Sequence, residues 1–272
     1  YRAGLGADVN LGSLRGVDST GFRDVIPSIK EQVDVWQMAG VSCARLKITN
    51  GRYRIKTEFI IPSFVELDFS PGGILVLDNV TLTHRGPAKM GLYPSFEYID
   101  SGKIYFDGSP QTLYPESWGA IAYQNVGAIV NDPTFTQSSF LPAIEDGILK
   151  ESGLAIHRAL QAVPGRGGIV QLSDGLYLTT TTASLPAHFG RMITIRGTGY
   201  DSTHILAPPG TTHTMFNSVT APTGGWLFHP TLENFRIAHY GSAGDVFAFT
   251  EGSQRPTFER LYIERISDAG SG

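Results

Sequence analysis

Short apolar runs separated by turn residues recur along the chain, and this pattern predicts many short β-strands. The runs are Cys43–Ile48, Tyr53–Ile55, Phe59–Ile61, Val65–Phe69, Ile74–Leu77, Val80–Thr83, Lys103–Phe106, Ile169–Leu172, Tyr177–Thr181, Met192–Ile195, His204–Leu206, Thr231–Ile237, Val246–Phe249 and Thr257–Ile263. Gly, Pro, Asn and Asp bound most of them, as expected for turns. The spacing disfavours alternation of strands with helices, so we expect an all-β fold.

Two stretches have helical spacing instead. In the first, Val25, Ile29, Val33 and Trp36 fall on one face, and Gly40 stands where a helix would end. The second begins after Ser152 and is closed by Pro164-Gly165. Its apolar stripe consists of Ala155, Ile156, Ala159, Leu160 and Val163. We expect one amphipathic helix in each stretch.

These patterns divide the chain into four parts. Residues 1–24 are rich in glycine and lack an apolar period, which predicts an irregular arm. Residues 25–120 form a smaller β-rich lead-in module, and residues 121–151 form a linker. Residues 152–272 begin with a helix and continue as the start of a larger β domain.

A near repeat at the end of the chain predicts the architecture of that domain. The segment Pro230–Ile237 reads PTLENFRI, and Pro256–Ile263 reads PTFERLYI, an offset of 26 residues (256 − 230). A period of this length is typical of a solenoid, in which each coil buries its apolar side chains against the next. We therefore expect three stacked pairs, which are Leu232 with Phe258, Phe235 with Leu261 and Ile237 with Ile263. A β-sandwich with two similar strands is the alternative.

A second echo joins the two halves of the chain. Gly51-Arg-Tyr53 followed by Ile61-Pro62 matches Gly175-Leu-Tyr177 followed by Leu185-Pro186, and both parts are offset by 124 residues (177 − 53 and 186 − 62). The chain is expected to begin the same kind of β layer twice.

The second half also matches a known pattern. In order, it has the helix of Ala155–Ala162, the strand Gly167-Gly-Ile-Val-Gln-Leu172, Asp174-Gly-Leu-Tyr177, Leu185-Pro186, Ile193-Thr-Ile195, Gly197-Thr-Gly199, Thr203 and Ile205. This order resembles the opening of pectate-lyase-like parallel β-helix proteins, and Ser173 stands where that family commonly has Pro. The segments Leu67–Gly73 and Tyr114–Ala120 resemble the lead-in module of some members.

The resemblance implies a right-handed parallel β-helix with an N-terminal capping helix, preceded by the lead-in module. The family includes bacterial polysaccharide lyases and hydrolases, and it includes the homotrimeric tailspikes of bacteriophages. A tailspike would be part of the extracellular virion tail, bind host surface polysaccharide, and contact other tail proteins through its N-terminal region. A secreted monomeric lyase or hydrolase and a structural virion protein are the alternatives. We expect the chain to be the front of a longer polypeptide, with catalytic coils beyond residue 272, and Trp226 and Phe228 to line the trimer interface.

Charge and composition narrow the candidate chemistry. The net charge is −4, from 21 basic and 25 acidic residues, which disfavours nucleic acid as a partner. No apolar run reaches the about 18 residues that a membrane span needs. Cys43 is the single cysteine and is expected to be buried, and neither zinc nor calcium motifs occur. Gly197-Thr-Gly199 lacks the third glycine of a dinucleotide fingerprint, so no cofactor is expected.

The repeat suggests one candidate glycan-binding site. In the 26-residue register Glu233 lies beside Glu259, and strand alternation points both outward. Two carboxylates at that spacing would suit a retaining glycosidase, and Arg236 beside Tyr262 could hold a sugar. A solvated face on which Arg236 and Arg260 neutralise the acids is the favoured interpretation. No catalytic residue is assigned.

Weaker candidates lie in predicted turns and strands. Tyr200-Asp201 and His239-Tyr240 could line a carbohydrate groove or simply pack against the fold. Asn79-Val-Thr81 is a formal glycosylation sequon within a predicted strand, and a single match is expected by chance.

Overall fold

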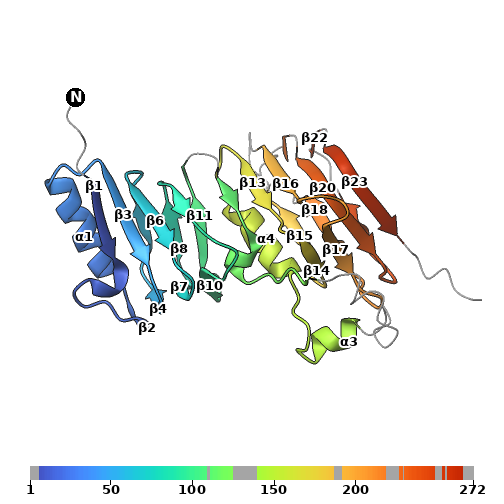
Figure 1. Ribbon diagram of the computed structural model, residues 1–272, viewed down its shortest axis with the longest axis horizontal. Coiled ribbons are helices and arrows are strands. Elements are labelled where there is room, and N and C mark those ends of the chain that lie inside the picture. The colour runs from blue at the N-terminus through green and yellow to red at the C-terminus, as the bar shows by residue number, and fades with distance from the viewer. Residues whose placement is uncertain are drawn as a thin grey trace, which may run out of the picture. The chain divides into compact units, whose positions relative to one another are not determined.

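The computed structural model describes residues 6–108, 111–124, 140–186, 192–218, 227–228, 230–248, 253–254 and 256–265 (Figure 1). These residues form mostly β-strands and few helices, as the apolar runs predicted. The ladders between the named strands are parallel. The chain divides into two compact units, one made mainly of residues 6–111 and the other mainly of residues 120–161 and 167–265.

Three parallel sheets build the first unit. One contains β1 (Gly6–Asn10), β3 (Cys43–Ile48), β6 (Val65–Phe69) and β9 (Ala88–Lys89), the second β2 (Thr20–Asp24), β4 (Gly51–Ile55), β7 (Gly73–Asp78) and β10 (Phe96–Ile99), and the third β5 (Phe59–Ile61), β8 (Thr81–His84) and β11 (Lys103–Phe106). Ala44 pairs with Val65, and Gly51 pairs with Gly73. Successive strands of these two sheets are thus 21 or 22 residues apart (65 − 44 and 73 − 51).

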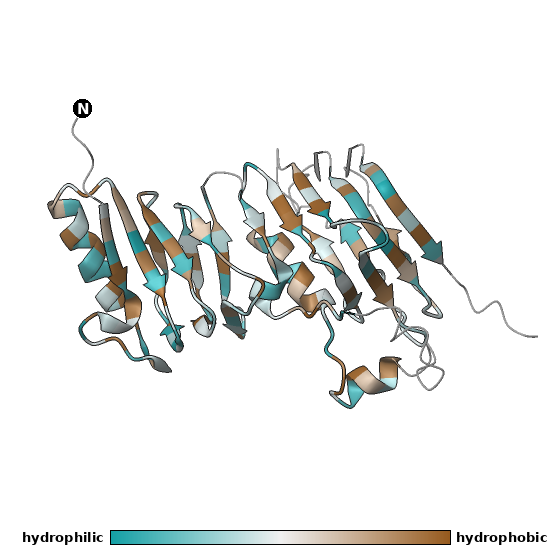
Figure 2. Ribbon diagram, in the orientation of Figure 1, coloured by the Kyte–Doolittle hydropathy of each residue, from teal (hydrophilic) through white to brown (hydrophobic). Residues whose placement is uncertain are grey.

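Alternation along these strands separates a buried face from a charged one, as Figure 2 shows by colour. Leu46 and Leu67 are register neighbours and are both buried. On the opposite face Arg45 pairs with Glu66 at 3.0 Å, and Arg54 pairs with Asp78 at 2.8 Å. Apolar burial therefore stabilises one side of each sheet, while opposite charges on neighbouring strands favour the same register on the other.

Helix α1 (Ile26–Met38) confirms the first helical prediction. Its buried residues are Ile26, Ile29, Val33 and Trp36. Pro27 occupies the first turn, and Gly40 follows the helix with a φ of 68°, where a side chain would be strained. Figure 1 shows the helix beside β1 at one end of the unit.

The predicted irregular arm at residues 1–24 is wrong for its described part. Strands β1 and β2 lie within it, together with the short 3₁₀ helix η1 (Leu11–Ser13). Both strands are edge strands with partly exposed side chains, and β2 contains a register shift between Thr20 and Asp24. Strands that bury little side-chain area need no apolar alternation, so the pattern did not reveal them.

The second unit contains the helices α3 (Phe140–Glu145) and α4 (Gly153–Ala162), and the residues of η2 (Pro115–Trp118) are divided between the two units. Its strands are β12 (Thr112–Leu113), β13 (Gly168–Gln171), β14 (Gly175–Leu178), β15 (Ala183–Leu185), β16 (Ile193–Arg196), β17 (Thr203–Ala207), β18 (Phe216–Ser218), β19 (Leu227–Phe228), β20 (Thr231–His239), β21 (Phe247–Ala248), β22 (Ser253–Gln254) and β23 (Thr257–Arg265). The predicted apolar stripe of α4 is buried throughout. The expected linker at residues 121–151 contains α3 and a bridge from Tyr123 to Leu176.

Strand β20 bends in its middle, and two shorter strands, β16 and β17, lie beside its two halves. Its first half pairs with β16 and its second half with β17. The corner lies at Asn234, which has a φ of 62°, and Arg260 takes the same conformation in β23 with a φ of 49°. This left-handed residue explains why the inward positions of the repeat are spaced by three and then by two.

The predicted register of the repeat is confirmed. Strands β20 and β23 are parallel neighbours, with Leu232 beside Phe258, Phe235 beside Leu261 and Ile237 beside Ile263. The two segments therefore lie in one sheet and run parallel to each other. The 124-residue echo also holds locally, because Gly51 and Gly175 begin β4 and β14 with positive φ. Tyr53 and Tyr177 are both buried.

Gly197 shows how closely the layers approach at this corner. A Cβ there would lie 2.2 Å from the Asn234 carbonyl oxygen, whereas a Cβ on Gly199 would lie 3.5 Å from the nearest atom, Ser202 Oγ. We expect Gly197→Ala to destabilise the second unit by about 2–4 kcal/mol, and Gly199→Ala to change its stability by less than about 0.5 kcal/mol. Denaturant unfolding of both variants measures this. Equal effects would show that the layers are not in contact at Asn234.

A buried histidine makes the stability of the first unit pH-dependent. His84 Nε2 donates to the Pro87 carbonyl at 2.8 Å, and burial lowers the pKa of His84 from 6.5 to about 4. The unfolded chain therefore binds more protons between these pH values, and stability falls as the pH drops. Between pH 7 and pH 5 we expect the wild type to lose about 2 kcal/mol more than His84→Asn. Denaturant midpoints at both pH values test this, and parallel losses would contradict it.

Candidate functional site

The four candidate residues lie together on the outward face of β20 and β23. Glu233 and Arg236 belong to β20, and Glu259 and Tyr262 belong to β23. In the register Glu233 is the neighbour of Glu259, and Arg236 is the neighbour of Tyr262. The two pairs lie on either side of the corner at Asn234, so they form two separate rows.

The row of Arg236 and Tyr262 is held by ionic and aromatic contacts. The Arg236 guanidinium lies over the Tyr262 ring, 4.7 Å from its centroid, and Arg236 Nη2 donates to Glu264 Oε2 at 2.5 Å. This hydrogen bond raises the pKa of Arg236. Tyr262 remains 51% exposed, so half of an ordered aromatic side chain faces solvent.

The row continues across the neighbouring strand through His204, which is the register neighbour of Arg236 on β17. Its Nε2 lies 3.2 Å from the Asp201 carbonyl. Burial lowers the pKa of His204, so the ring is uncharged at neutral pH. His204, Arg236 and Tyr262 thus present an imidazole, a guanidinium and a phenol side by side.

The two carboxylates of the other row, Glu233 and Glu259, lie in different environments. Glu233 forms an ion pair with Arg196, and its side chain is only 12% exposed. Glu259 is exposed and has no ion-pair partner among the described residues. The expected neutralisation of these acids by Arg236 and Arg260 is wrong, because Arg196 binds Glu233 while Arg236 binds Glu264.

An apolar strip beside the first row is covered by α3. Phe140 and Tyr240 pack with the strand residues Leu176, Leu178, Leu206 and Ala238, and Ile144 and Leu149 extend the contact. Alternation places Leu206 on the opposite side of β17 from the inward Ile205. The helix therefore shields the outward apolar positions and leaves the row of Arg236 and Tyr262 uncovered.

Of the weaker candidates, Asp201 contacts this site through its carbonyl oxygen beside His204, and the others do not. His239 is buried, with Nδ1 accepting from the Gly241 amide and Nε2 donating to the His213 carbonyl, and Tyr240 is also buried. Neither can line an open groove. Tyr200 is exposed in the turn after β16. Trp226 and the side chain of Phe228 lie outside the described residues.

Two other clusters of hydrogen-bonded polar side chains, one around Glu116 and one around Asp18, offer no open site to a ligand. Glu116 is buried, and its Oε1 accepts from the hydroxyls of Ser173 and Tyr177. Burial followed by the nearby Glu116 charge raises the pKa of Tyr177. Ser173 therefore supplies a hydroxyl donor that a proline at this position would lack. The cluster is enclosed, so we assign it to folding.

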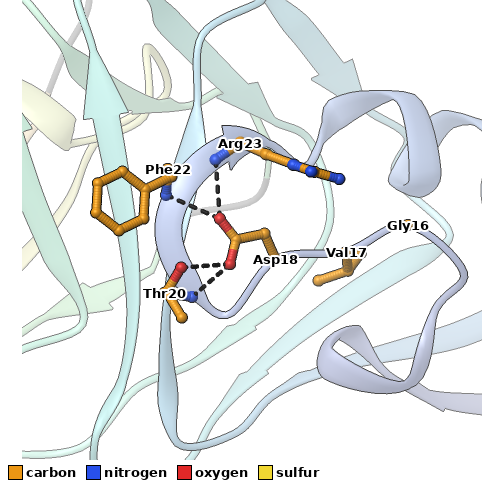
Figure 3. A pocket seen from close by; sticks show the side chains of 6 residues that line it. All are labelled: Gly16, Val17, Asp18, Thr20, Phe22 and Arg23. Atoms are coloured by element: carbon orange, nitrogen blue, oxygen red, sulfur yellow. Dashed lines mark hydrogen bonds between the residues drawn. The ribbon is translucent and has the colours of Figure 1, made fainter.

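Figure 3 shows the second cluster, a shallow hollow lined by Gly16, Val17, Asp18, Thr20, Phe22 and Arg23. The Asp18 carboxylate accepts from the backbone amides of Thr20, Phe22 and Arg23 and from the Thr20 hydroxyl, at 2.5–3.0 Å. These hydrogen bonds lower the pKa of Asp18. The carboxylate uses the donors of the loop itself, so they are not available to a ligand.

The remaining candidates are metal sites, membrane-spanning helices, Cys43 and the sequon at Asn79. Among the described residues no group of three His, Cys, Asp or Glu is arranged to hold a metal ion. Within the same ranges no helix is long and apolar enough to cross a membrane. Cys43 is exposed at the first position of β3, so the expectation that it is buried is wrong. Asn79 lies in an exposed turn between β7 and β8, not in a strand.

Comparisons with known proteins add little. No family model and no curated protein matches the chain. A solved structure described as a "putative glycosyl hydrolase" from Parabacteroides merdae ATCC 43184 aligns over 94% of this chain and 95% of that chain, with 13% identity and a TM-score of 0.24. The function must therefore be argued from the site.

Sequence reasoning missed Arg196 and Glu264, which hold Glu233 and Arg236 in place. Arg196 lies 37 positions before Glu233 (233 − 196) because the chain makes a longer excursion between β16 and β20. The 26-residue repeat alone could not have found it. Glu264 could have been predicted, since it follows Ile263 of the repeat and strand alternation points it outward.

The two glutamates should respond differently to loss of charge. Glu233→Gln removes a shielded ion pair and should destabilise the second unit by about 1–2 kcal/mol, whereas Glu259→Gln should stay within about 0.5 kcal/mol of wild type. Denaturant unfolding tests both. If both variants instead keep wild-type stability and abolish a measurable glycan hydrolysis, the pair is catalytic.

Proposed function

We propose that the chain forms a right-handed parallel β-helix whose outward face on β20 and β23 binds polysaccharide. The parallel pairing of strands that recur at regular intervals supports this architecture. Parallel strands that follow one another in a sheet are almost always joined by right-handed connections, which supports the handedness.

The observation that carries the binding proposal is the exposed ring of Tyr262, fixed in place by Arg236 and Glu264. Sugars present an apolar C–H face that packs on an aromatic ring, and their hydroxyls hydrogen-bond to charged groups at the ring edge. An ordered ring loses little conformational freedom on binding. Neighbouring Glu259 and His204 supply further polar contacts along the same face.

The arrangement favours attachment over cleavage. A retaining glycosidase needs one carboxylate free to attack and a second that exchanges a proton. Glu233 is shielded and bound to Arg196, so it is poorly placed for either role. We therefore propose a tailspike-type attachment protein, an extracellular homotrimer on the virion tail that binds host surface polysaccharide and contacts other tail proteins through its N-terminal region.

Replacing the ring should remove binding without unfolding the protein. We expect Tyr262→Ser to weaken polysaccharide binding at least about tenfold, because the stacking contact is lost. Phe22→Ser is the matched control, since Phe22 is an exposed aromatic residue in the other unit. Glycan-array screening followed by titration calorimetry measures both variants, with circular dichroism as the check on folding.

Two results would contradict the proposal. One is polysaccharide binding that Tyr262→Ser leaves unchanged, and the other is the absence of binding to any glycan. A chain that is a monomer by light scattering and releases reducing ends from polysaccharide would favour the alternative, a secreted lyase or hydrolase of the same fold.

A further inference from the structure

The charges around Tyr262 indicate what class of glycan the face accepts, an inference that rests on the proposed function. The described side chains at β16, β20 and β23 include three guanidinium groups and three carboxylates. They are Arg196, Arg236, Arg260, Glu233, Glu259 and Glu264. The charges of these six groups cancel, the side chain of Arg265 at the end of β23 lies outside the described residues, and the whole chain carries a net charge of −4.

Two of the three guanidinium groups are already neutralised. Arg196 binds Glu233, and Arg236 binds Glu264. A sugar carboxylate that approached Arg236 would have to displace the Glu264 carboxylate or share the guanidinium with it. His204, the third group in that row, is uncharged at neutral pH because burial lowers its pKa.

The row of Glu233 and Glu259 contains one carboxylate that lies outside the described ion pairs. Glu259 is exposed, and no cation among the described residues forms an ion pair with it. Arg260, the next residue, is also exposed and lies at the corner. A polyuronate carries a negative charge on each sugar, so on this face it would meet Glu259, which lies outside the described ion pairs, as well as Arg260.

We propose that the face of Tyr262, Arg236 and Glu259 selects uncharged glycans and excludes acidic ones. The ring stacks on the sugar, while Glu259 and Glu264 accept hydrogen bonds from its hydroxyls. A neutral ligand keeps the existing ion pairs intact. An acidic polysaccharide would break these ion pairs of the protein or be repelled by the Glu259 carboxylate.

The test compares neutral hexose oligosaccharides with oligogalacturonates of matched length, at low salt and at about 0.15 M salt. We expect the neutral oligosaccharides to bind with an affinity that salt changes less than about twofold, and the oligogalacturonates not to bind at either salt concentration. Binding of oligogalacturonates that strengthens at low salt would overturn the inference and leave the proposed polysaccharide binding intact. Failure of both ligand classes would contradict the proposed function itself.

A charge reversal separates exclusion by charge from exclusion by shape. Glu259→Arg replaces a negative charge by a positive one, a net change of +2, at an exposed position outside the described ion pairs. We expect this variant to gain salt-sensitive binding of oligogalacturonates and to bind neutral oligosaccharides more weakly, because it loses the hydrogen bonds that Glu259 accepts. If oligogalacturonates still fail to bind, the carboxylates are not what excludes them, and the inference is wrong.

Discussion

Parallel pairing between strands one repeat apart is the interaction on which the rest of this structure depends. Leu232, Phe235 and Ile237 are fully buried because the strands on either side cover them. A fully buried side chain of this size contributes roughly 1.5–3 kcal/mol, whereas an exposed ion pair contributes about 1 kcal/mol or less. The apolar face therefore holds the layers together, and the charged face acts mainly on register.

The same pairing builds the candidate site. Residues 26 positions apart become neighbours, so Arg236 meets Tyr262 across one strand gap. The corner at Asn234 then separates this row from the row of Glu233 and Glu259. A rigid ladder with an ordered aromatic ring suits the binding of an extended ligand, since successive strands present their outward side chains in line.

The repeat in the sequence was sufficient to predict the register of β20 and β23, because identical spacing of apolar residues leaves one way to stack them. Helices α1 and α4 were predictable as well, since Trp36 and Ile156 fall on clear amphipathic faces, whereas α3 lies in the segment expected to be a linker. The strands β1 and β2 were not, because partly exposed edge strands bury too little to impose a pattern. The Arg196 ion pair was also hidden, since it depends on a connection of irregular length.

Disulfide trapping tests the parallel ladder most directly. Thr231 and Thr257 are register neighbours at the starts of β20 and β23. Neighbouring parallel strands lie about 4.8 Å apart, which is within the reach of a disulfide. The account predicts that Thr231→Cys with Thr257→Cys forms an intramolecular disulfide in the folded protein, and that Thr231→Cys with Ile263→Cys does not. Cross-linking of the second pair but not the first would place the strands antiparallel and contradict it.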